Sequence, residues 1–260
     1  MPAPDVRLYR SKPKLAGTGK NSKPHMPAAI QAPKFAGFQP ALLGFLGELA
    51  ANNNRVWFDA NRQRYEDSVL FPALDFVAAM APRLEKISRR FEAIPRRRGG
   101  SLMRVYRDTR FSADKTPYKT NLGIQFRHVV GRDIHAPGFY FHIEPGDCFI
   151  GVGSWHPHAE ALAKIRARIA DKPQLWQQVL DDKAFRRQFT FAGDSLKRPP
   201  KGYAGDHPLI ADLRRKDFIA IKRLDDDALR DDKLTTKVAT LFAAGAPLMQ
   251  FLCAALEVDY

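Results

Sequence analysis

Apolar residues between Leu42 and about Phe91 recur every three or four positions. This spacing places them on one face of a helix. Pro40 fits an early helical position, the Asn52–Asn54 run fits a helix end followed by a cap, and Phe71-Pro72 fits a further start. We therefore expect three consecutive helices over this stretch.

In the middle of the chain the apolar period changes to two, which is typical of strands with one buried face. The predicted strands are Leu102–Arg107, Asn121–Val129, Gly138–Ile143 and Cys148–Val152. Pro145-Gly146 marks a turn between the last two. Because the connections are short, we expect a mostly antiparallel sheet.

Helical spacing returns after Trp155, and Leu234–Leu256 predicts a closing helix with a break near Gly245. Phe218–Ile221 is a fifth strand candidate. The whole pattern predicts the α+β class, with N-terminal helices, a central mostly antiparallel sheet and C-terminal helices.

Residues 1–34 differ from the rest, because they are rich in Pro, Lys, Gly and Ser and have almost no apolar periodicity. They hold seven basic residues and one acid, a net +6 of the chain's formal +14. We expect a basic disordered tail over 1–34 and a single α+β domain over 35–260. The charge favours polyanionic partners, with solubility alone as the alternative explanation.

No apolar run approaches the roughly 20 residues that a membrane-spanning helix needs, and no secretory leader is visible. The sequence therefore predicts a cytoplasmic protein with no membrane partner. Cys148 and Cys253 both lie in apolar patterns and form no C-x-x-C pair. We expect two buried, inert thiols, while a disulfide or a reactive thiol is the less favoured alternative.

The segment from Arg104 to Lys119 is the most informative part of the sequence. It carries five cations in sixteen residues, interleaved with three aromatic residues and two aspartates. Guanidinium groups suit phosphate or carboxylate, and aromatic rings beside them can stack a base. The candidate ligand-binding residues are Arg107, Arg110, Ser112, Lys115, Tyr118 and Lys119, with Trp155 beside them on one concave surface.

Asp108 and Asp114 allow two further interpretations of the same segment. Either could act as a general base toward an anionic substrate that the cations hold. Alternatively, both could neutralise Arg107, Arg110 and Lys115 in a salt-bridged loop that only closes the sheet.

The run Arg107–Lys119, of the form R-D-x-R-F-S-x-D-K-x-P-Y-K, resembles the hallmark of a widespread uncharacterised family of bacteria and fungi, catalogued as a domain of unknown function. Further positions are similar to that family's motifs in the same order: Asn53, Asn54, Trp57, Phe58, Asn61, Tyr65, Gly151, Gly153, Trp155, Pro199, Gly202, Tyr203, His207, Pro208, Lys216 and Phe218. The resemblance spans about Phe35 to Phe251. It implies no activity, so the function is argued from the residues.

A metal site is a weaker hypothesis. His142 and Glu144 are two apart on a predicted strand and could share a face, with His156 or His158 as a third ligand. His156-Pro157-His158 also fits a helix start, so we expect neither a metal nor another cofactor.

Three functions remain open from the sequence. The favoured one is a binding or processing module for a phosphate-bearing ligand, nucleic acid included. The alternatives are a small-molecule enzyme with an aspartate base and a non-catalytic interaction scaffold. An open basic face would favour nucleic acid, whereas a closed pocket with a buried carboxylate would favour an enzyme. Nothing in the sequence fixes the oligomeric state.

Overall fold

A computed structural model describes residues 35–131 and 136–260. The predicted basic tail, residues 1–34, lies outside the described residues. Within them the protein is α+β, as predicted, with helices on both sides of the strands in the sequence.

The sheet is antiparallel throughout and has the strand order β1-β2-β3-β4-β6-β5. Its strands are β1 (Phe91–Glu92), β2 (Leu122–His128), β3 (Gly138–Ile143), β4 (Cys148–Ser154), β5 (Thr190–Ala192) and β6 (Phe218–Leu224). The last strand in the chain thus pairs with β4 in the middle of the sheet, and the short β5 forms the edge beyond it.

The N-terminal helices follow one another almost without loops. They are α1 (Pro40–Ala51), α2 (Arg55–Ala60), α3 (Arg62–Tyr65), the π-helical turn η2 (Glu66–Leu70) and α4 (Phe71–Ile87). Asn54 begins α2 as a cap, because its side-chain oxygen accepts a hydrogen bond from the backbone N–H of Trp57 at 2.9 Å.

The second half of the chain is mainly helical around β5 and β6. Its helices are α5 (Ala159–Asp171), α6 (Pro173–Asp181), α7 (Lys183–Gln188), α8 (Ile210–Leu213), the 3-10 turn η3 (Asp226–Arg230), α9 (Leu234–Ala244) and α10 (Ala246–Ala255). No helix in the described residues is by itself long and apolar enough to cross a membrane. The bent pair α9–α10, with 51° between its helices, meets the criteria of length and composition only together.

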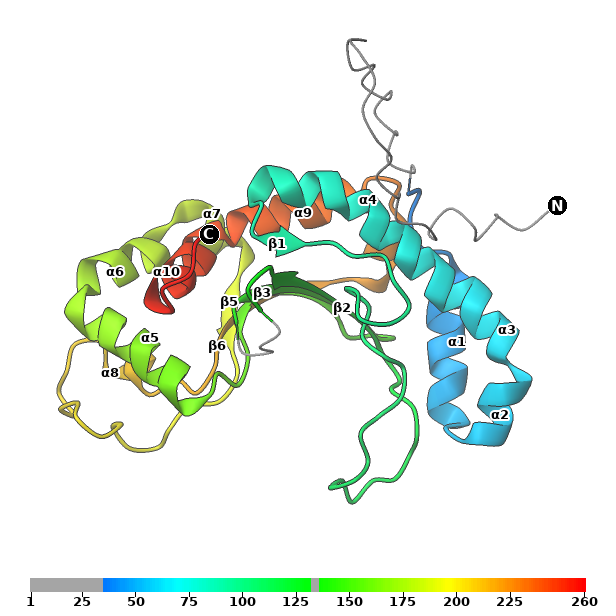
Figure 1. Ribbon diagram of the computed structural model, residues 1–260, viewed down its shortest axis with the longest axis horizontal. Coiled ribbons are helices and arrows are strands. Elements are labelled where there is room, and N and C mark those ends of the chain that lie inside the picture. The colour runs from blue at the N-terminus through cyan, green and yellow to red at the C-terminus, as the bar shows by residue number, and fades with distance from the viewer. Residues whose placement is uncertain (1–34, 132–135) are drawn as a thin grey trace, which may run out of the picture. The chain divides into compact units, whose positions relative to one another are not determined.

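Helices cover one face of the sheet, with α4 and α9 side by side upon it (Figure 1). Alternate strand residues point into this layer and are fully buried: Ile124, Phe126, Phe139, Phe141, Ile150, Val152, Phe218 and Ala220. Phe242 of α9 packs against Phe126 and Phe139 with ring centroids 5.5 and 4.6 Å away. Burying one such phenyl ring stabilises the fold by about 1.5–3 kcal/mol.

Two sequence predictions about elements were wrong. The stretch Leu102–Arg107 is not a strand, because it pairs only at the isolated bridges Leu102↔Ile124 and Tyr106↔Tyr118. The apolar pattern predicts that the third helix extends to about Phe91. In the structure α4 ends at Ile87, and Phe91 lies in β1, opposite His128. Phe91 is buried against the sheet from an extended backbone, and burial alone does not distinguish that from a helical face.

After Val152 the sequence predicts mainly helices with one strand candidate, and the structure has two strands there, β5 and β6. The candidate Phe218–Ile221 is confirmed and extends to Leu224 as β6. The edge strand β5 has three residues and gave no periodic signal. The long closing helix breaks at Gly245, as expected.

Candidate functional site

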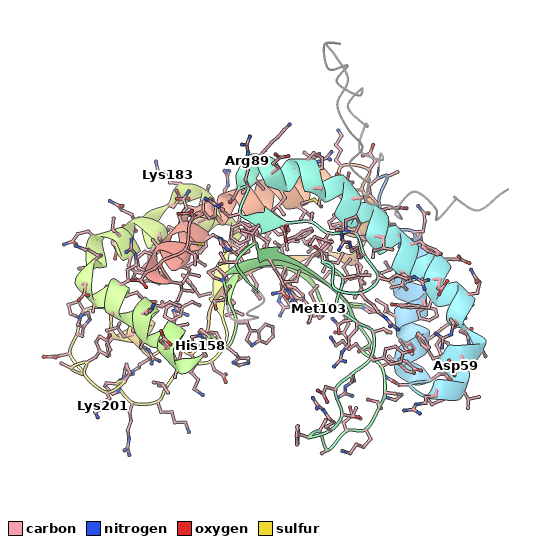
Figure 2. All side chains as sticks on the ribbon, viewed as in Figure 1. Asp59, Arg89, Met103, His158, Lys183 and Lys201 are labelled. Carbon is pink, nitrogen blue, oxygen red and sulfur yellow. The ribbon has the colours of Figure 1, made fainter. Side chains whose placement is uncertain are left out.

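The face of the sheet opposite α4 and α9 carries a cavity of about 520 Å³. Figure 2 shows Met103 on this side of the sheet. Phe139 and Val152 of the core reach this cavity, but most strand residues that line it alternate with those of the core: Gln125, Arg127, Gly138, Tyr140, Phe149, Gly151, Gly153, Ile219, Ile221 and Arg223. Aromatic, aliphatic and glycine positions dominate this floor, so most of it is apolar.

Gly123 of β2 leaves room for two side chains that line this cavity. A Cβ there would lie 2.8 Å from the hydroxyl oxygen of Tyr140 and 3.0 Å from the sulfur of Met103. The absence of a side chain therefore lets the Tyr140 ring lie across β2. Burial raises the pKa of Tyr140 to about 12, so this phenol is neutral at physiological pH.

Trp155 stands at the end of β4, lines the same cavity and is half exposed. The turn that places it is held by Asp217, a buried carboxylate that accepts hydrogen bonds from the backbone N–H groups of His156, at 2.7 Å, and Asp194, at 2.9 Å. Gly153 has φ +122°, and a Cβ there would meet the carbonyl oxygen of Phe218 at 2.0 Å, so only glycine fits. The backbone conformation and the close contact thus explain the second glycine of the Gly-x-Gly-x-Trp motif.

A second cavity of about 810 Å³ lies between the α2–η2 helices and residues 97–106. Six basic side chains and one acidic side chain line it. The basic residues are Arg62, Arg97, Arg98, Arg104, Lys119 and Arg127, and the acid is Glu66. This basic cavity is therefore strongly positive.

Only part of that charge is compensated locally. Arg97 pairs with Glu66 at 2.6 Å and Arg62 with Asp59 at 2.5 Å. No acid among the described residues forms an ion pair with Arg98, Arg104 or Lys119. The pKa of the half-buried Lys119 lies below its usual value, first because burial penalises its charge and then because Arg104 repels it.

The two cavities adjoin one another, because Met103 and Arg127 line both. A basic compartment thus opens directly onto an apolar, aromatic floor. Together they can hold a molecule with an anionic group at one end and an apolar or ring-shaped part at the other.

The candidate loop between Arg107 and Tyr118 is organised differently. Arg107 pairs with Asp114 and donates to the hydroxyl of Thr116. Arg110 forms a two-pronged pair with Asp108, with nitrogen–oxygen distances of 2.7 and 3.0 Å. Further along the loop, the Lys115 ammonium donates to the carbonyl of Thr109 at 2.9 Å, and Ser112 donates its backbone N–H to the same carbonyl.

These pairs leave both aspartates ionised. The hydrogen bond from Arg110 lowers the pKa of Asp108 to about 2, and the hydrogen bond from Arg107 lowers the pKa of Asp114 to about 2. Both carboxylates lie at the surface. Phe111 at the loop tip is also exposed, with Arg110 over its ring.

The base of this loop is docked on the N-terminal helices. The Asn53 side chain bonds to both backbone groups of Tyr118, donating to its carbonyl at 2.9 Å and accepting from its N–H at 3.0 Å. The buried Tyr118 ring stacks on Phe58, with centroids 4.1 Å apart. The Asn-Asn-x-x-Trp-Phe motif therefore caps α2 with one asparagine and anchors the loop with the other.

Of the sequence-predicted ligand residues, Lys119 lines the basic cavity and Trp155 lines the sheet-face cavity. Arg107, Arg110, Ser112, Lys115 and Tyr118 line neither of these cavities, and the same holds for Asp108 and Asp114. Sequence reasoning missed Arg98, Arg104 as a cavity residue, Arg127, Tyr140 and Phe149. The run Arg96–Gly100, three arginines before two glycines, is a signal that could have located part of the site.

The histidines proposed as a metal set do not all meet. The Nδ1 of His158 caps α5 by accepting from the N–H of Ala161 at 3.0 Å, and His156 pairs with Asp217 at 3.2 Å. His142 and Glu144 do share a face, with Nε2 and Oε2 3.2 Å apart. Both cysteines are buried free thiols, and burial raises the pKa of each to about 12.

Comparison with known proteins identifies a family, but the description of that family names no activity. Residues 41–251 match the model of a family described as conserved hypothetical protein (DUF2461). No curated protein and no solved structure matches the chain.

Proposed function

The chain belongs to the DUF2461 family of conserved hypothetical proteins, and from its own geometry we propose that it binds a small phosphate-bearing organic molecule. The phosphate occupies the basic cavity at Arg98, Arg104 and Lys119. The organic part lies on the sheet face against Tyr140, Phe149 and Trp155.

The observation that carries this proposal is the unpaired charge of the basic cavity. Two like charges about 4 Å apart repel by roughly 4 kcal/mol near a protein surface. A half-buried lysine beside arginines, with no acid paired to it among the described residues, therefore costs stability unless an anion is bound. Arginine and lysine donors are also the side chains that phosphate oxygens prefer.

The sheet-face cavity supports an organic ligand rather than inorganic phosphate alone. Its lining is mostly aromatic, aliphatic and glycine, with Arg127 and Arg223 as its cationic side chains. Flat rings pack well against aromatic side chains, and stacking of a base on an aromatic ring is worth about 1–3 kcal/mol. A nucleotide-like molecule satisfies both compartments.

The size of the site favours a small molecule over a long polymer. Cavities of about 810 and 520 Å³ fall in the usual range for small-molecule sites. A nucleic-acid contact and an aspartate base at Asp108 or Asp114 stay predictions from the sequence. The arginine partners of these aspartates do not favour proton abstraction, because a carboxylate with a pKa near 2 is a weak base.

The test is calorimetric titration of the full chain with phosphate, adenosine, AMP, ATP and short single- and double-stranded oligonucleotides. We expect nucleotides to bind more tightly than phosphate or adenosine alone. Arg104→Gln and Lys119→Gln should each weaken binding about 10- to 100-fold, the equivalent of one charge-assisted hydrogen bond of about 1.5–3 kcal/mol.

Arg110→Gln is the matched control, because it removes one cation from the same segment but outside both cavities. It should change affinity less than twofold. Equal losses in Arg110→Gln and Arg104→Gln would move the site to the loop. Binding confined to oligonucleotides, with a steep salt dependence, would favour nucleic acid. A wild type that binds nothing on the panel would refute the proposal.

A further inference from the structure

The hairpin between β3 and β4 brings together three side chains that bind metals. They are His142 on β3 and Glu144 and Asp147 at the two ends of the turn, and one ligand atom from each lies within 4.8 Å of the others. We propose that this cluster is a binding site for a divalent first-row transition metal such as Zn²⁺. The proposal is independent of the phosphate site and goes beyond it.

The sequence builds the cluster through one tight turn. Glu144-Pro145-Gly146-Asp147 is closed by a hydrogen bond from the N–H of Asp147 to the carbonyl of Glu144 at 3.0 Å, and Gly146 has φ +75°. Pro in the second position and a positive-φ Gly in the third are typical of a type II turn. Such a turn brings its first and last residues together, and here both carry carboxylates.

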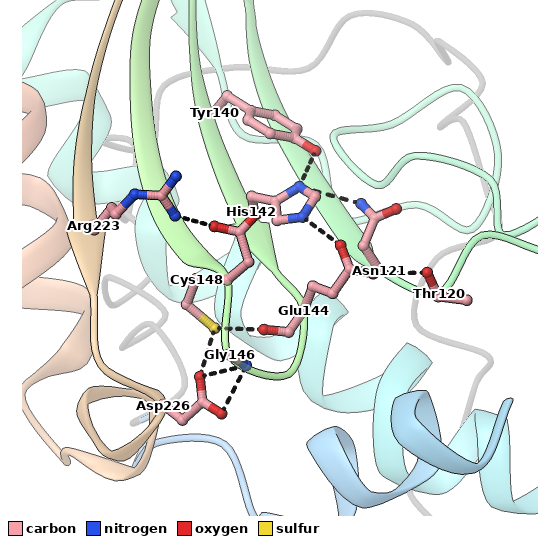
Figure 3. A network of polar contacts seen from close by, with 10 residues as sticks. Thr120, Asn121, Tyr140, His142, Glu144, Gly146, Cys148, Arg223 and Asp226 are labelled. Carbon is pink, nitrogen blue, oxygen red and sulfur yellow. Dashed lines mark hydrogen bonds and ion pairs between the residues drawn. The ribbon is translucent and has the colours of Figure 1, made fainter. Parts of the chain in front are cut away.

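His142 joins them because residues two apart on a strand share a face. Its Nε2 lies 3.2 Å from Oε2 of Glu144 (Figure 3). Two ligand atoms on one tetrahedral metal, with bonds of about 2.0–2.1 Å, are about 3.3–3.4 Å apart. These two atoms are therefore already spaced as neighbouring ligands.

Contacts outside the cluster hold both side chains in place. Metal binding at Nε2 requires the ring proton on Nδ1, which can donate it to the Tyr140 hydroxyl oxygen 3.1 Å away, and the ring stacks on Phe149 at 4.6 Å. In the metal-free protein the amide nitrogen of Asn121, a donor, also lies 3.3 Å from Nδ1. The second carboxylate oxygen of Glu144 accepts from the hydroxyl of Thr120 at 2.7 Å. Metal ligands are usually oriented by such outer partners, which fix the ring and the carboxylate.

Charge and ligand type set the class of ion. One neutral imidazole and two carboxylates match a divalent cation, and imidazole nitrogen favours zinc, cobalt and nickel over magnesium and calcium. The side chains are partly buried, so the ion would lose only part of its water. Tyr140, Phe149 and Arg223 also line the sheet-face cavity, so the ion would lie at its margin.

Arg223 would compete with a metal ion for the Asp147 carboxylate. It pairs with Asp147 and so supplies the positive charge that a metal would otherwise bring (Figure 3). Asp147 is the most exposed of the three ligands and can turn to the ion once this pair opens. This rivalry makes an unusual prediction: removing a cation should tighten metal binding.

The experiment is titration of the metal-free full chain with Zn²⁺, Co²⁺ and Mg²⁺ by calorimetry, with the visible absorption of Co²⁺ as a second readout. We expect Zn²⁺ and Co²⁺ to bind once per chain at this cluster and Mg²⁺ far more weakly. His142→Gln, Glu144→Gln and Asp147→Asn should each lower Zn²⁺ affinity at least about tenfold, the smallest usual effect of even an outer partner. Arg223→Gln should raise it.

Asp226→Asn is the matched control, because Asp226 is a carboxylate that contacts the same hairpin at the N–H of Gly146 but lies outside the cluster. Its Zn²⁺ affinity should equal that of the wild type. Asp147→Asn keeps the proposal testable if His142→Gln does not fold, because Asp147 is at the surface. A wild type that takes up neither Zn²⁺ nor Co²⁺ at millimolar concentration would overturn the proposal. Uptake unchanged in the cluster variants, or weakened in Arg223→Gln, would overturn it too.

Discussion

Two regions rich in arginine and lysine meet at Lys119, and they deal with the repulsion among their cations in different ways. In the loop from Arg107 to Tyr118, Arg107 and Arg110 each have an aspartate partner within a few residues. In the basic cavity, Arg98, Arg104 and Lys119 have no ion-pair partner among the described residues. In the first region aspartates offset two of the three cations, whereas in the second these three cations keep a positive charge that a ligand can use.

The difference shows that density of charge along a sequence does not tell which cations of a segment stay unpaired. Asp108 and Asp114 lie within the dense run Arg107–Lys119 and pair with two of its four cations. Of the three unpaired cations, Arg104 and Lys119 are the two ends of the dense segment, and the fold brings Arg98 to the same cavity. Ion pairs between exposed side chains contribute little to stability, because water and salt screen them.

The largest expected effect is on the contact that both regions share. Phe58 lines the basic cavity and stacks on Tyr118 at the base of the loop. Phe58→Ala should lower the free energy of unfolding by about 3–5 kcal/mol, as for other buried phenylalanines, and release the loop. Urea denaturation and limited proteolysis between Arg107 and Lys119 measure the two effects.

Phe111→Ala is the control for this variant, because Phe111 lies in the same loop but is exposed. It should stay within about 0.5 kcal/mol of the wild type. If Phe58→Ala leaves the loop as resistant to protease as before, the loop is held by Asn53 alone and the two regions are not coupled through the ring.

Much of the fold was predictable because hydrophobic period is a local property. Gly138–Ile143 has the predicted bounds, and the other long strands differ by a few residues at most. Short edge strands such as β5 carry too few residues for a period. Leu102–Arg107 has the right alternation, but it leaves the edge of β2 after one bridge, and only the three-dimensional path of the chain decides that.

The site was less predictable, because most of its residues act through distant contacts. Two residues that line the cavities, Lys119 and Trp155, were named from the sequence, since one lies in a dense basic run and the other follows a glycine motif. Tyr140 and Phe149 look like ordinary strand residues, and only the fold shows that they line a cavity on the sheet face opposite α4 and α9. Asn53 shows the same limit, since its partner Tyr118 is sixty-five residues away.

A smaller effect is expected on thermal stability: removing a cation should raise the melting temperature in the basic cavity and lower it in the loop. Lys119 has a lowered pKa in the folded protein, so between that value and its usual one the unfolded chain binds more protons. Stability therefore rises with pH through this window, and the charge on Lys119 is a cost at pH 7. Lys119→Met should raise the melting temperature by about 1–3 °C, where 1 kcal/mol corresponds to about 2–4 °C, while weakening ligand binding.

Arg107→Met is the comparison for that variant, because it removes a cation that has a partner. It should lower the melting temperature slightly and leave ligand affinity unchanged. Calorimetric scans of both proteins, with and without nucleotide, check the pair. A lower melting temperature in Lys119→Met would mean that its charge is compensated in the folded protein, and the contrast between the regions would fail.

The smallest expected effect is the titration of the two paired aspartates of the loop in acid. The pKa values of Asp108 and Asp114 are lowered to about 2, against about 3.9 in an unfolded chain. Below the unfolded value the folded loop binds fewer protons, so its pairs stabilise it fully above about pH 4 and are lost as the pH falls through about 2.

Carboxyl resonances followed by NMR should give midpoints near 2 for both aspartates. Arg110→Gln should return Asp108 toward its usual pKa and leave Asp114 where it was, because Asp114 depends on Arg107. If both aspartates titrate near 4 in the wild type, the arginines do not hold them in solution. The loop cations would then be as available to a ligand as those of the cavity.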